Sequence, residues 1–341
     1  MTITLRPLGK NGPLVPAIGF GLMMMTDTKY GAVPEKDARL ALLDRAVEIG
    51  ATFWDTSDLY GDNEELLAQW FKRSGKRDQI FLASKFGYVR GSKTMEIDTS
   101  YEACKNACNM TLDTMEIDHL DLYYVHNVDT VTPIEQTMRA LVELQTEGKI
   151  KHIGLSMVSS NTLRRAVKVA PVAAYQPEYS LFDRAIEGPA GTDVLATCRE
   201  LGIAVVCATP LGRGILTSTF SQGGAIGDNT DLRGKMLPRF QDGAREHNAN
   251  LAGKIKTIAD RKGCSLSQLA LAWLLKQGDD IFPIPGTRRV KYLEENMGAL
   301  GVSLSDEEEA EMRAIVDQGH VSGGSVPDAF AAYIFRDTKS E

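Results

Sequence analysis

The sequence predicts a single α/β domain in which eight parallel strands and their helices close into a (β/α)8 TIM barrel. Short, continuously apolar runs alternate with segments whose apolar residues recur at helical spacing. This alternation is typical of parallel strands that helices cover on the outside. The chain has 341 residues, of which 43% are hydrophobic. A barrel of this kind runs to about 250 residues or more as one domain. Residues 1–341 are therefore expected to form one domain.

Eight apolar runs have the length of strands and are separated by helical segments. They lie at residues 17–23, 52–56, 80–85, 120–126, 152–156, 172–176, 203–208 and 281–284. Eight such units favour a closed barrel. The alternative, a doubly wound sheet with a dinucleotide site, requires a Gly-x-Gly-x-x-Gly turn after the first strand. No such turn follows residues 17–23.

The helical segments are marked by periodicity and by start signals. They are expected over 38–49, 63–73, 99–115 and about 191–201, and from 132, 160 and 289 onwards. In the second segment Leu66 and Trp70 recur at helical spacing, and Asn63 is placed to cap the helix. Thr132 followed by Pro133 predicts a capped helix with proline at its first position.

The two ends of the chain are expected to lie outside the strand–helix repeat. Residues 1–16 predict a hairpin with its turn at 9–12. A C-terminal tail over 303–341 begins with an acidic helix start at Ser305, and its end is expected either to be mobile or to cover the site. A long loop is expected over about 212–245.

Polar side chains stand at the C-terminal ends of three successive expected strands. The apolar run 52–54 is followed at once by Asp55 and then by Tyr60, before a turn. The next strand ends in Lys85, and the one after it ends in His126. Because these strand ends meet at one mouth of a barrel, the four side chains are expected to form a site there. A cation beside Tyr60 lowers the pKa of its phenol from the usual value of about 10.

This arrangement resembles the aldo-keto reductases, because Asp55, Tyr60, Lys85 and His126 match the family's catalytic tetrad in order and spacing. The resemblance covers nearly the whole chain. It is closest to the branch of fungal, bacterial and plant NADPH-dependent reductases, on the motifs Glu178-Tyr179-Ser180-Leu181, Pro210-Leu211-Gly212-Arg213-Gly214, Pro238-Arg239-Phe240 and Ile284-Pro285-Gly286-Thr287-Arg288. It implies that the N-terminal hairpin caps the bottom of the barrel and that the C-terminal tail lies over the mouth.

The resemblance implies that the protein reduces a small aldehyde or ketone to the alcohol. No side chain can supply a hydride, so NADPH must supply it, and a positioned general acid must supply the proton. Tyr60 takes that role in the family's scheme. Lys85 lowers the pKa of Tyr60, Asp55 keeps Lys85 charged and oriented, and His126 donates to the carbonyl oxygen or orients it.

The later strands are expected to hold the nicotinamide and the pyrophosphate. By the resemblance, Ser156 and Gln176 match the residues that hold the nicotinamide carboxamide, and Met23 and Asp55 belong to the same region. The loop beside the pyrophosphate comprises Pro210, Leu211, Gly212, Arg213 and Gly214. Its glycines allow backbone N–H groups to face phosphate oxygens, and Arg213 adds a charge. The glycines of the first strand also predict a backbone that a ligand can approach closely.

The adenosine end of the cofactor is expected at the helix that follows the eighth strand. A hydroxyl and a guanidinium at a helix N-terminus suit a phosphate, here the 2′-phosphate of NADP. The residues concerned are Gly286, Thr287 and Arg288. By the resemblance, Glu295 and Asn296 contact the adenine, and Tyr292 lies in the same site.

Several positions depart from the usual pattern of this branch. Met157 follows Ser156 where an acidic or amide residue is common, and Val125 and Asn127 flank His126 where Gln and Arg are usual. Residues 208–209 are Ala-Thr where the family commonly has Tyr-Ser. That tyrosine stacks on the nicotinamide, so its loss is expected to weaken the stacking or to leave room for another group.

Composition excludes several classes of partner. The net charge is −7 without a Lys/Arg-rich tract, which argues against nucleic acid. The apolar runs are far shorter than a membrane span of about 20 residues, and residues 1–6 show no secretory signal. Five cysteines without regular spacing suit reduced thiols in the cytoplasm. Cys104 and Cys108 lie four residues apart but no second ligand pair follows, so no metal site is expected. Nothing in the sequence specifies an oligomeric state.

Two other functions compete with the reductase. One is a cofactor-binding regulatory or redox-sensing subunit with little turnover, as the channel β-subunits similar to this family are. The other is a structural protein that reuses the barrel. The complete tetrad favours the enzyme. Turnover of an aldehyde with NADPH separates the reductase from the structural protein, and a stable membrane-protein partner would support the regulatory subunit.

Overall fold

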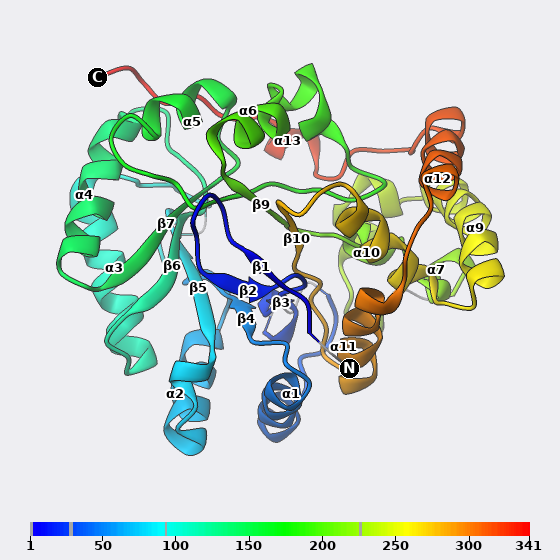
Figure 1. Cartoon of the computed structure of the whole chain (residues 1–341), viewed down its shortest axis with the longest axis horizontal. Helices are drawn as coiled ribbons and strands as arrows, with labels where there is room; N and C mark the ends of the chain where they lie inside the picture. The colour runs from blue at the N-terminus through cyan, green and yellow to red at the C-terminus, as the bar shows by residue number, and fades with distance from the viewer. Residues whose placement is uncertain (1–2, 27–29, 93, 225–226) are drawn as a thin grey trace.

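The computed structural model describes residues 3–26, 30–92, 94–224 and 227–341. It confirms the (β/α)8 barrel: eight parallel strands follow one another around the sheet in chain order, with helices outside (Figure 1). The barrel strands are β3 (Phe20–Gly21), β4 (Phe53–Asp55), β5 (Phe81–Phe86), β6 (Leu120–Val125), β7 (Ile150–Ser156), β8 (Ala174–Gln176), β9 (Ala204–Cys207) and β10 (Ile281–Pro283). Each lies within or beside a run expected from the sequence.

Backbone contacts between the first strand and the last close the barrel. The N–H of Gly19 donates to the carbonyl of Pro283 at 2.9 Å, and Gly21 forms a parallel bridge with Gly286. A Cβ on Gly21 would lie 2.7 Å from the carbonyl oxygen of Ile284. The glycines of the first strand were expected to admit a ligand, and the structure gives them another role. They let the backbone after β10 come close enough to complete the ring.

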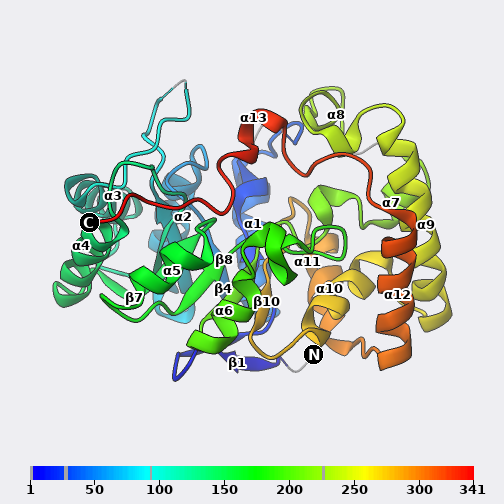
Figure 2. The same cartoon turned by 90° about the horizontal axis from the view of Figure 1, so that it is seen from above.

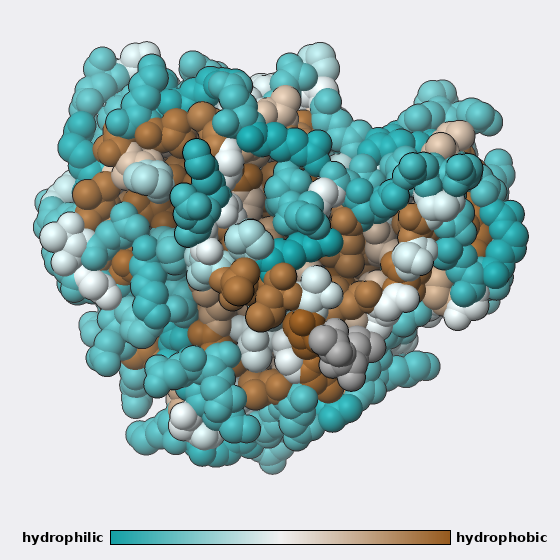
Figure 3. Space-filling view, in the orientation of Figure 1, coloured by the Kyte–Doolittle hydropathy of each residue, from teal (hydrophilic) through white to brown (hydrophobic). Residues whose placement is uncertain are grey.

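The N-terminal hairpin closes the bottom of the barrel, as the resemblance implied. Strands β1 (Leu5–Pro7) and β2 (Leu14–Pro16) pair antiparallel. Leu8 and Val15 are fully buried in the cluster that fills the barrel interior, together with residues such as Phe53, Leu122 and Phe282. Leu5 and Leu14 of the hairpin are exposed. Figure 3 shows hydrophobic residues near the middle of the face on which the hairpin lies.

The helices form a layer around the barrel, and a larger apolar core lies between the two layers. Their bounds are α1 (Lys36–Glu48), α2 (Asn63–Ser74), α3 (Tyr101–Met115), α4 (Ile134–Thr146), α5 (Ser160–Ala166), α6 (Val194–Leu201), α7 (Ser218–Ser221), α8 (Arg233–Met236), α9 (Ala244–Lys262), α10 (Leu266–Lys276), α11 (Val290–Gly298), α12 (Asp306–Gly319) and α13 (Asp328–Ala331). Among the described residues, no helix is long and apolar enough to cross a membrane.

Two predicted helix starts are wrong by one residue. Asn63 is the first residue of α2 rather than its cap, and its side chain donates to Thr56 Oγ1 at 2.8 Å. Pro133 is the N-cap of α4 rather than its first helical residue. Both helix starts are tied to the preceding loop: Asn63 contacts Thr56, and the backbone N–H of Thr132 donates to Asp129 Oδ1 at 2.6 Å.

The C-terminal tail crosses the barrel mouth. Helix α12 begins with the predicted acidic start and a capping box between Ser305 and Glu308. The following segment, with α13, lies on the side of the barrel opposite to β1 (Figure 2). Its end is held at β7 and α5, where Arg336 bridges Val158 and the backbone N–H of Thr338 donates to Thr162 Oγ1 at 3.1 Å. Of the two expectations for this segment, the structure agrees with a tail folded over the site.

Candidate active site

The four tetrad residues meet at the C-terminal mouth because their strands are neighbours in register. Asp55 ends β4, where it pairs with Ala83 of β5, and Lys85 pairs with Tyr124 of β6. His126 follows β6 directly, and its N–H donates to the carbonyl of Phe86 at 2.7 Å. Tyr60 lies on the turn between β4 and α2, where its own N–H donates to the carbonyl of Ser57 at 3.1 Å.

Lys85 and Asp55 form a buried ion pair below the mouth. Lys85 Nζ lies 2.5 Å from Asp55 Oδ1 and donates to the carbonyl oxygen of Thr56 at 2.8 Å. The two side chains are 0% and 3% exposed. Burial disfavours the ammonium, but the Asp55 carboxylate and the Tyr60 oxygen outweigh this penalty, so the pKa of Lys85 is raised. Lys85 therefore stays charged across the physiological range.

Tyr60 lies next to this ion pair and reaches towards the mouth. Lys85 Nζ is 3.5 Å from its Oη and 5.0 Å from the centre of its ring. Burial raises the pKa of Tyr60 above 10, and Lys85 opposes the shift without reversing it. The lowering effect expected of Lys85 is present, yet the phenol remains protonated at neutral pH.

His126 is the fourth member and is held on its Nδ1 side. Nδ1 lies 3.1 Å from Ser57 Oγ, and the ring packs edge-on against Tyr60 and Tyr88 at centroid distances of 5.9 and 5.2 Å. Burial, assisted by the charge of Lys85, lowers the pKa of His126 well below its usual value. The imidazole is therefore neutral at physiological pH.

The two residues expected to hold a carboxamide lie beside Asp55. Ser156 ends β7 and Gln176 ends β8, and they are register partners. Ser156 Oγ donates to the carbonyl of Gln176 at 2.7 Å, and Gln176 Nε2 donates to Asp55 Oδ2 at 2.8 Å. One carboxylate thus links the lysine of the tetrad to the amide at the end of β8. This link was not expected from the sequence.

The loop expected beside a pyrophosphate folds into a tight turn. Gly212, Arg213 and Gly214 have positive φ angles of 56°, 58° and 105°. The N–H groups of Gly212 and Gly214 donate to the carbonyls of Thr209 and Leu211, so they are used within the turn. The preceding residue, Pro210, is buried.

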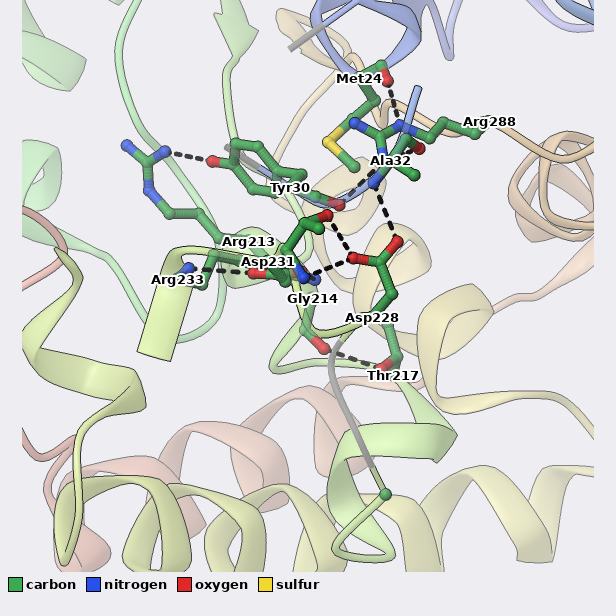
Figure 4. Close-up of polar contacts among 12 residues, drawn as sticks. Met24, Tyr30, Ala32, Arg213, Gly214, Thr217, Asp228, Asp231, Arg233 and Arg288 are labelled. Atoms are coloured by element: carbon green, nitrogen blue, oxygen red, sulfur yellow. Dashed lines mark hydrogen bonds and ion pairs between the residues drawn. The ribbon is translucent and has the colours of Figure 1, made fainter. Parts of the chain in front are cut away.

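Arg213 does not stand free beside this turn. Its guanidinium donates to Glu178 at 2.5 Å. It also donates to Tyr30 Oη at 2.6 Å (Figure 4). Burial disfavours its charge, but Glu178 and Tyr30 more than offset the penalty and raise its pKa. Any phosphate that binds here would meet a charge that Glu178 already balances.

The residues expected at the 2′-phosphate lie where β10 runs into α11. Arg288 reaches back to the first βα loop, donating to the carbonyls of Met24 at 2.5 Å, Tyr30 at 2.9 Å and Ala32 at 2.8 Å (Figure 4). Met23 belongs to the short 3-10 turn that begins this loop. Thr287 is buried, and its Oγ1 accepts from the N–H of Arg289 at 3.1 Å. Gly286 packs against Gly21, where a Cβ would lie 2.9 Å from the carbonyl of Gly21.

The N-terminus of α11 has no side-chain cap among the described residues, as is also the case for helices such as α1, α2, α4 and α6, whereas four other helices are capped by serine. Side chains of Ser100, Ser159, Ser265 and Ser305 cap α3, α5, α10 and α12. Within the described ranges no side chain caps α11, whose N-cap position is taken by Arg289. Cations are unfavourable at the positive end of a helix dipole and anions are favourable there. Two arginines at an uncapped helix start fit a site that receives an anion.

The remaining expected cofactor residues lie along α11. Tyr292 is 37% exposed, with the Arg289 guanidinium 5.6 Å from its ring centre. Asn296 is buried, one turn further on. Glu295 accepts a hydrogen bond from Ser265 Oγ at 2.6 Å, which ties it to the start of α10. These residues lie on the helix that begins at the predicted phosphate site, and their contacts with a cofactor stay a prediction.

Two residues at the mouth, Asn127 and Ser57, were not assigned a site role from the sequence. Asn127 Nδ2 donates to the carbonyl of Tyr333 at 2.9 Å and to Tyr88 Oη at 3.3 Å. Asn127 is one of the departures from the family pattern, and here it joins the C-terminal tail to the loop after β5. Ser57, which contacts His126, was also not predicted, although it stands only two residues after Asp55 in the sequence.

No metal centre is present in the part of the chain that the structure describes. Cys104 and Cys108 are buried free thiols on α3, as expected. Burial raises the pKa of Cys108 to about 12, so it remains a thiol at neutral pH.

The sequence is similar to those of known aldo-keto reductases. The chain is 46% identical to the NADP(+)-designated aldo-keto reductase yakc of Schizosaccharomyces pombe, over 99% of this chain and 98% of that protein. It is 40% identical to aldo-keto reductase str7 of Strobilurus tenacellus, over 95% of each chain. It is also 40% identical to the probable aldo-keto reductase 1 of Glycine max, over 93% of this chain and 90% of that protein.

Solved structures show the same fold. A thermostable aldo-keto reductase in complex with the inhibitor epalrestat superposes with a TM-score of 0.73 at 25% identity, covering 92% of this chain and 100% of that one. A glycerol dehydrogenase from Gluconobacter oxydans superposes with a TM-score of 0.81 at 24% identity, over 94% and 97% of the two chains. The model of the Aldo/keto reductase family matches residues 17–317. On the tetrad geometry, the barrel and these similarities together, the chain belongs to the aldo/keto reductase family.

Proposed function

We propose that this protein reduces an aldehyde or ketone to the alcohol with NADPH, and that Tyr60 donates the proton. The observation that carries the proposal is the chain of contacts Asp55–Lys85–Tyr60. A buried, charged lysine lies 3.5 Å from a phenol that reaches the mouth. This arrangement supplies a protonated acid and a cation that stabilises the phenolate it leaves behind.

The proposed reaction assigns each tetrad residue a separate task. With NADPH bound, the hydride for the carbonyl carbon would come from its nicotinamide. The O–H bond of Tyr60 breaks as the alcohol O–H forms, and Lys85 stabilises the resulting phenolate. Asp55 keeps Lys85 charged, and His126 holds the carbonyl oxygen within reach of Tyr60. The raised pKa of Tyr60 keeps its proton in place until the transfer.

NADPH is the proposed cofactor on two grounds. The relative from Schizosaccharomyces pombe carries NADP(+) in its name. The start of α11 brings Thr287, Arg288 and Arg289 to an uncapped helix N-terminus. The 2′-phosphate that distinguishes NADPH from NADH carries close to two negative charges. A site built for an anion therefore discriminates between the two cofactors.

The proposal is tested by the consumption of NADPH with a panel of aldehydes and ketones. We expect turnover with at least one carbonyl class and much weaker turnover with NADH. Tight binding of NADPH without turnover of any carbonyl would favour the regulatory subunit over the reductase. Absence of both NADPH binding and turnover would favour the structural protein that reuses the barrel.

A second set of measurements concerns cofactor choice. Arg288→Ala is expected to lower the affinity for NADPH about ten- to a hundredfold and to leave NADH nearly unaffected. A charge-assisted bond to phosphate contributes roughly 1.5–3 kcal/mol, which corresponds to this range. The dissociation constants of both cofactors are measured by fluorescence titration for wild type and variant.

Arg289→Ala is the matched control, because it removes the same charge from the same helix start. The Arg289 side chain is turned over Tyr292, so we expect a smaller loss of NADPH affinity. Equal affinity of the wild type for NADPH and NADH would contradict the assignment. So would a loss in Arg288→Ala that is the same for both cofactors, since it would show that Arg288 only holds the loop of Tyr30 and Ala32.

A further inference from the structure

The hydroxyl of Ser57 is surrounded by three hydrogen-bonding groups at the edge of the tetrad. The N–H of Leu59 donates to Ser57 Oγ at 3.1 Å, Asp58 Oδ1 lies 3.2 Å away, and His126 Nδ1 lies 3.1 Å away on the other side. A hydroxyl has one proton to donate and two lone pairs to accept with. Leu59 always takes one lone pair, so the proton and the remaining lone pair are divided between Asp58 and His126.

Two arrangements, one for each charge state of Asp58, let Asp58 Oδ1, Ser57 Oγ and His126 Nδ1 pair without conflict. When Asp58 is a carboxylate it can only accept, so Ser57 donates to Asp58 and accepts from His126, whose proton must then be on Nδ1. When Asp58 is a carboxylic acid it donates to Ser57, and Ser57 donates to His126 Nδ1. The proton of His126 is then on Nε2. The two arrangements differ in the direction of both hydrogen bonds and in the tautomer of the imidazole.

The tautomer determines what His126 can do at the mouth. The ring is neutral at physiological pH because its pKa is lowered well below the usual value, so it carries one ring proton. With that proton on Nε2, His126 donates a hydrogen bond to a carbonyl oxygen. With the proton on Nδ1, Nε2 is an acceptor, and it repels the lone pairs of the same oxygen.

We propose that Asp58 acts through Ser57 as a positioning residue for His126, so that His126 is a hydrogen-bond donor to the carbonyl only while Asp58 is protonated. The proposal rests on the function proposed above, in which His126 meets the carbonyl oxygen. It adds two residues, Ser57, which contacts His126, and Asp58, which contacts Ser57. It also makes carbonyl reduction sensitive to a group outside the tetrad.

The surroundings of Asp58 place its titration near neutrality. Its side chain is 3% exposed, and Arg90 Nε lies 3.9 Å from Asp58 Oδ2. Arg90 is shared with Glu64 of α2, which forms an ion pair with it. Burial raises the pKa of Asp58 to about 7, Arg90 and Lys85 oppose the shift, and Glu64 adds to it. Tyr123 of β6 is the remaining titratable group that faces Asp58, and burial keeps it protonated.

The direction of the pH effect follows from these groups. Below pH about 7 Asp58 is protonated and His126 donates through Nε2. As the pH rises through this value Asp58 ionises, His126 changes tautomer, and kcat/KM for reduction falls. Asp58→Asn replaces the acid by an amide whose N–H donates to Ser57 at every pH. We expect this variant to keep the low-pH tautomer and to lose the fall in kcat/KM.

The tautomer is measured directly by nitrogen NMR of the full-length protein labelled with 15N-histidine. The chain has five histidines, and the His126 signals are identified by their loss in His126→Gln. Between about pH 5 and about pH 8, the wild type is expected to change from the Nε2–H to the Nδ1–H form. Ser57→Ala breaks the connection, so its His126 tautomer should no longer follow the pH.

Asp62→Asn is the matched control, because Asp62 is a nearby exposed carboxylate that pairs with the buried Arg39. In this variant the His126 tautomer is expected to change with pH as it does in the wild type. One tautomer at both ends of the pH range in the wild type would overturn the proposal. A tautomer change that persists in Asp58→Asn or Ser57→Ala would overturn it as well. The NMR experiment needs neither cofactor nor substrate, so a protein that shows the tautomer change but reduces no carbonyl would contradict the proposed function instead.

Discussion

Tyr60→Phe is expected to lower kcat for carbonyl reduction by about 10²–10⁴-fold, the usual cost of removing a general acid. The variant keeps the ring, and with it the edge-on contact with His126 and the position of Lys85 5.0 Å from the ring centre. Only the Oη that Lys85 approaches at 3.5 Å is removed. Binding of NADPH should therefore remain close to that of the wild type. Steady-state kinetics and fluorescence titration measure the two effects separately.

Tyr88→Phe is a matched control for this prediction. Tyr88 also packs against His126, and its hydroxyl accepts a hydrogen bond from Asn127 at 3.3 Å. Loss of one such bond contributes about 1 kcal/mol, so the rate should change less than about tenfold. If Tyr60→Phe retained more than about a tenth of the wild-type rate, a barrier change under about 1.4 kcal/mol, Tyr60 would not be the proton donor.

Lys85→Met is expected to abolish reduction at neutral pH. Lys85 lowers the pKa of Tyr60 against the opposing effect of burial, so its loss raises that pKa further and leaves a weaker acid. It also leaves the Asp55 carboxylate, 3% exposed, without its cation. Removing one partner of a buried ion pair typically costs about 3–5 kcal/mol of stability. A pH–rate profile and a thermal melt report the two consequences.

A double variant separates chemistry from folding. Asp55→Asn together with Lys85→Met removes both charges, so the melting temperature should recover towards that of the wild type while activity stays absent. A single variant with the wild-type pH–rate profile would show that Lys85 does not act on Tyr60. If the double variant were as unstable as Lys85→Met, the unpaired Asp55 carboxylate would not be the cause of the lost stability.

The barrel and the tetrad could be predicted because both depend on patterns between residues that are close in the sequence. A short apolar run predicts a strand. Asp55, Lys85 and His126 each stand at the C-terminal end of such a run, so the strand determines their position. The register of parallel strands then brings them together without further information. The same locality explains the errors at Asn63 and Pro133, where the choice between two adjacent residues depends on contacts of the preceding loop.

Contacts between distant parts of the chain could not be predicted in this way. Asn127 was noticed as an unusual residue, but its partner Tyr333 lies 206 positions away. Arg288 was expected to face a phosphate, and its contacts with the carbonyls of Tyr30 and Ala32 depend on how the first loop folds back over the last strand. The part played by Ser57 needs the position of His126, which only the assembled mouth provides.

The contact between Gly21 and Gly286 joins the first strand to the segment after the last strand. Gly286 is also the first residue of the predicted phosphate site, residues 286–288. The halves of the chain must therefore meet before this end of the cofactor site exists, and an isolated half-barrel should not bind NADPH. A ligand that binds only the native state stabilises it by about 2.7 kcal/mol at a hundred times its dissociation constant. We expect NADPH to raise the melting temperature and to slow unfolding that starts by separation of these two strands. Adenosine 2′,5′-bisphosphate, which lacks the nicotinamide, should reproduce much of the effect, because its phosphate and adenine bind on the side where the ring closes.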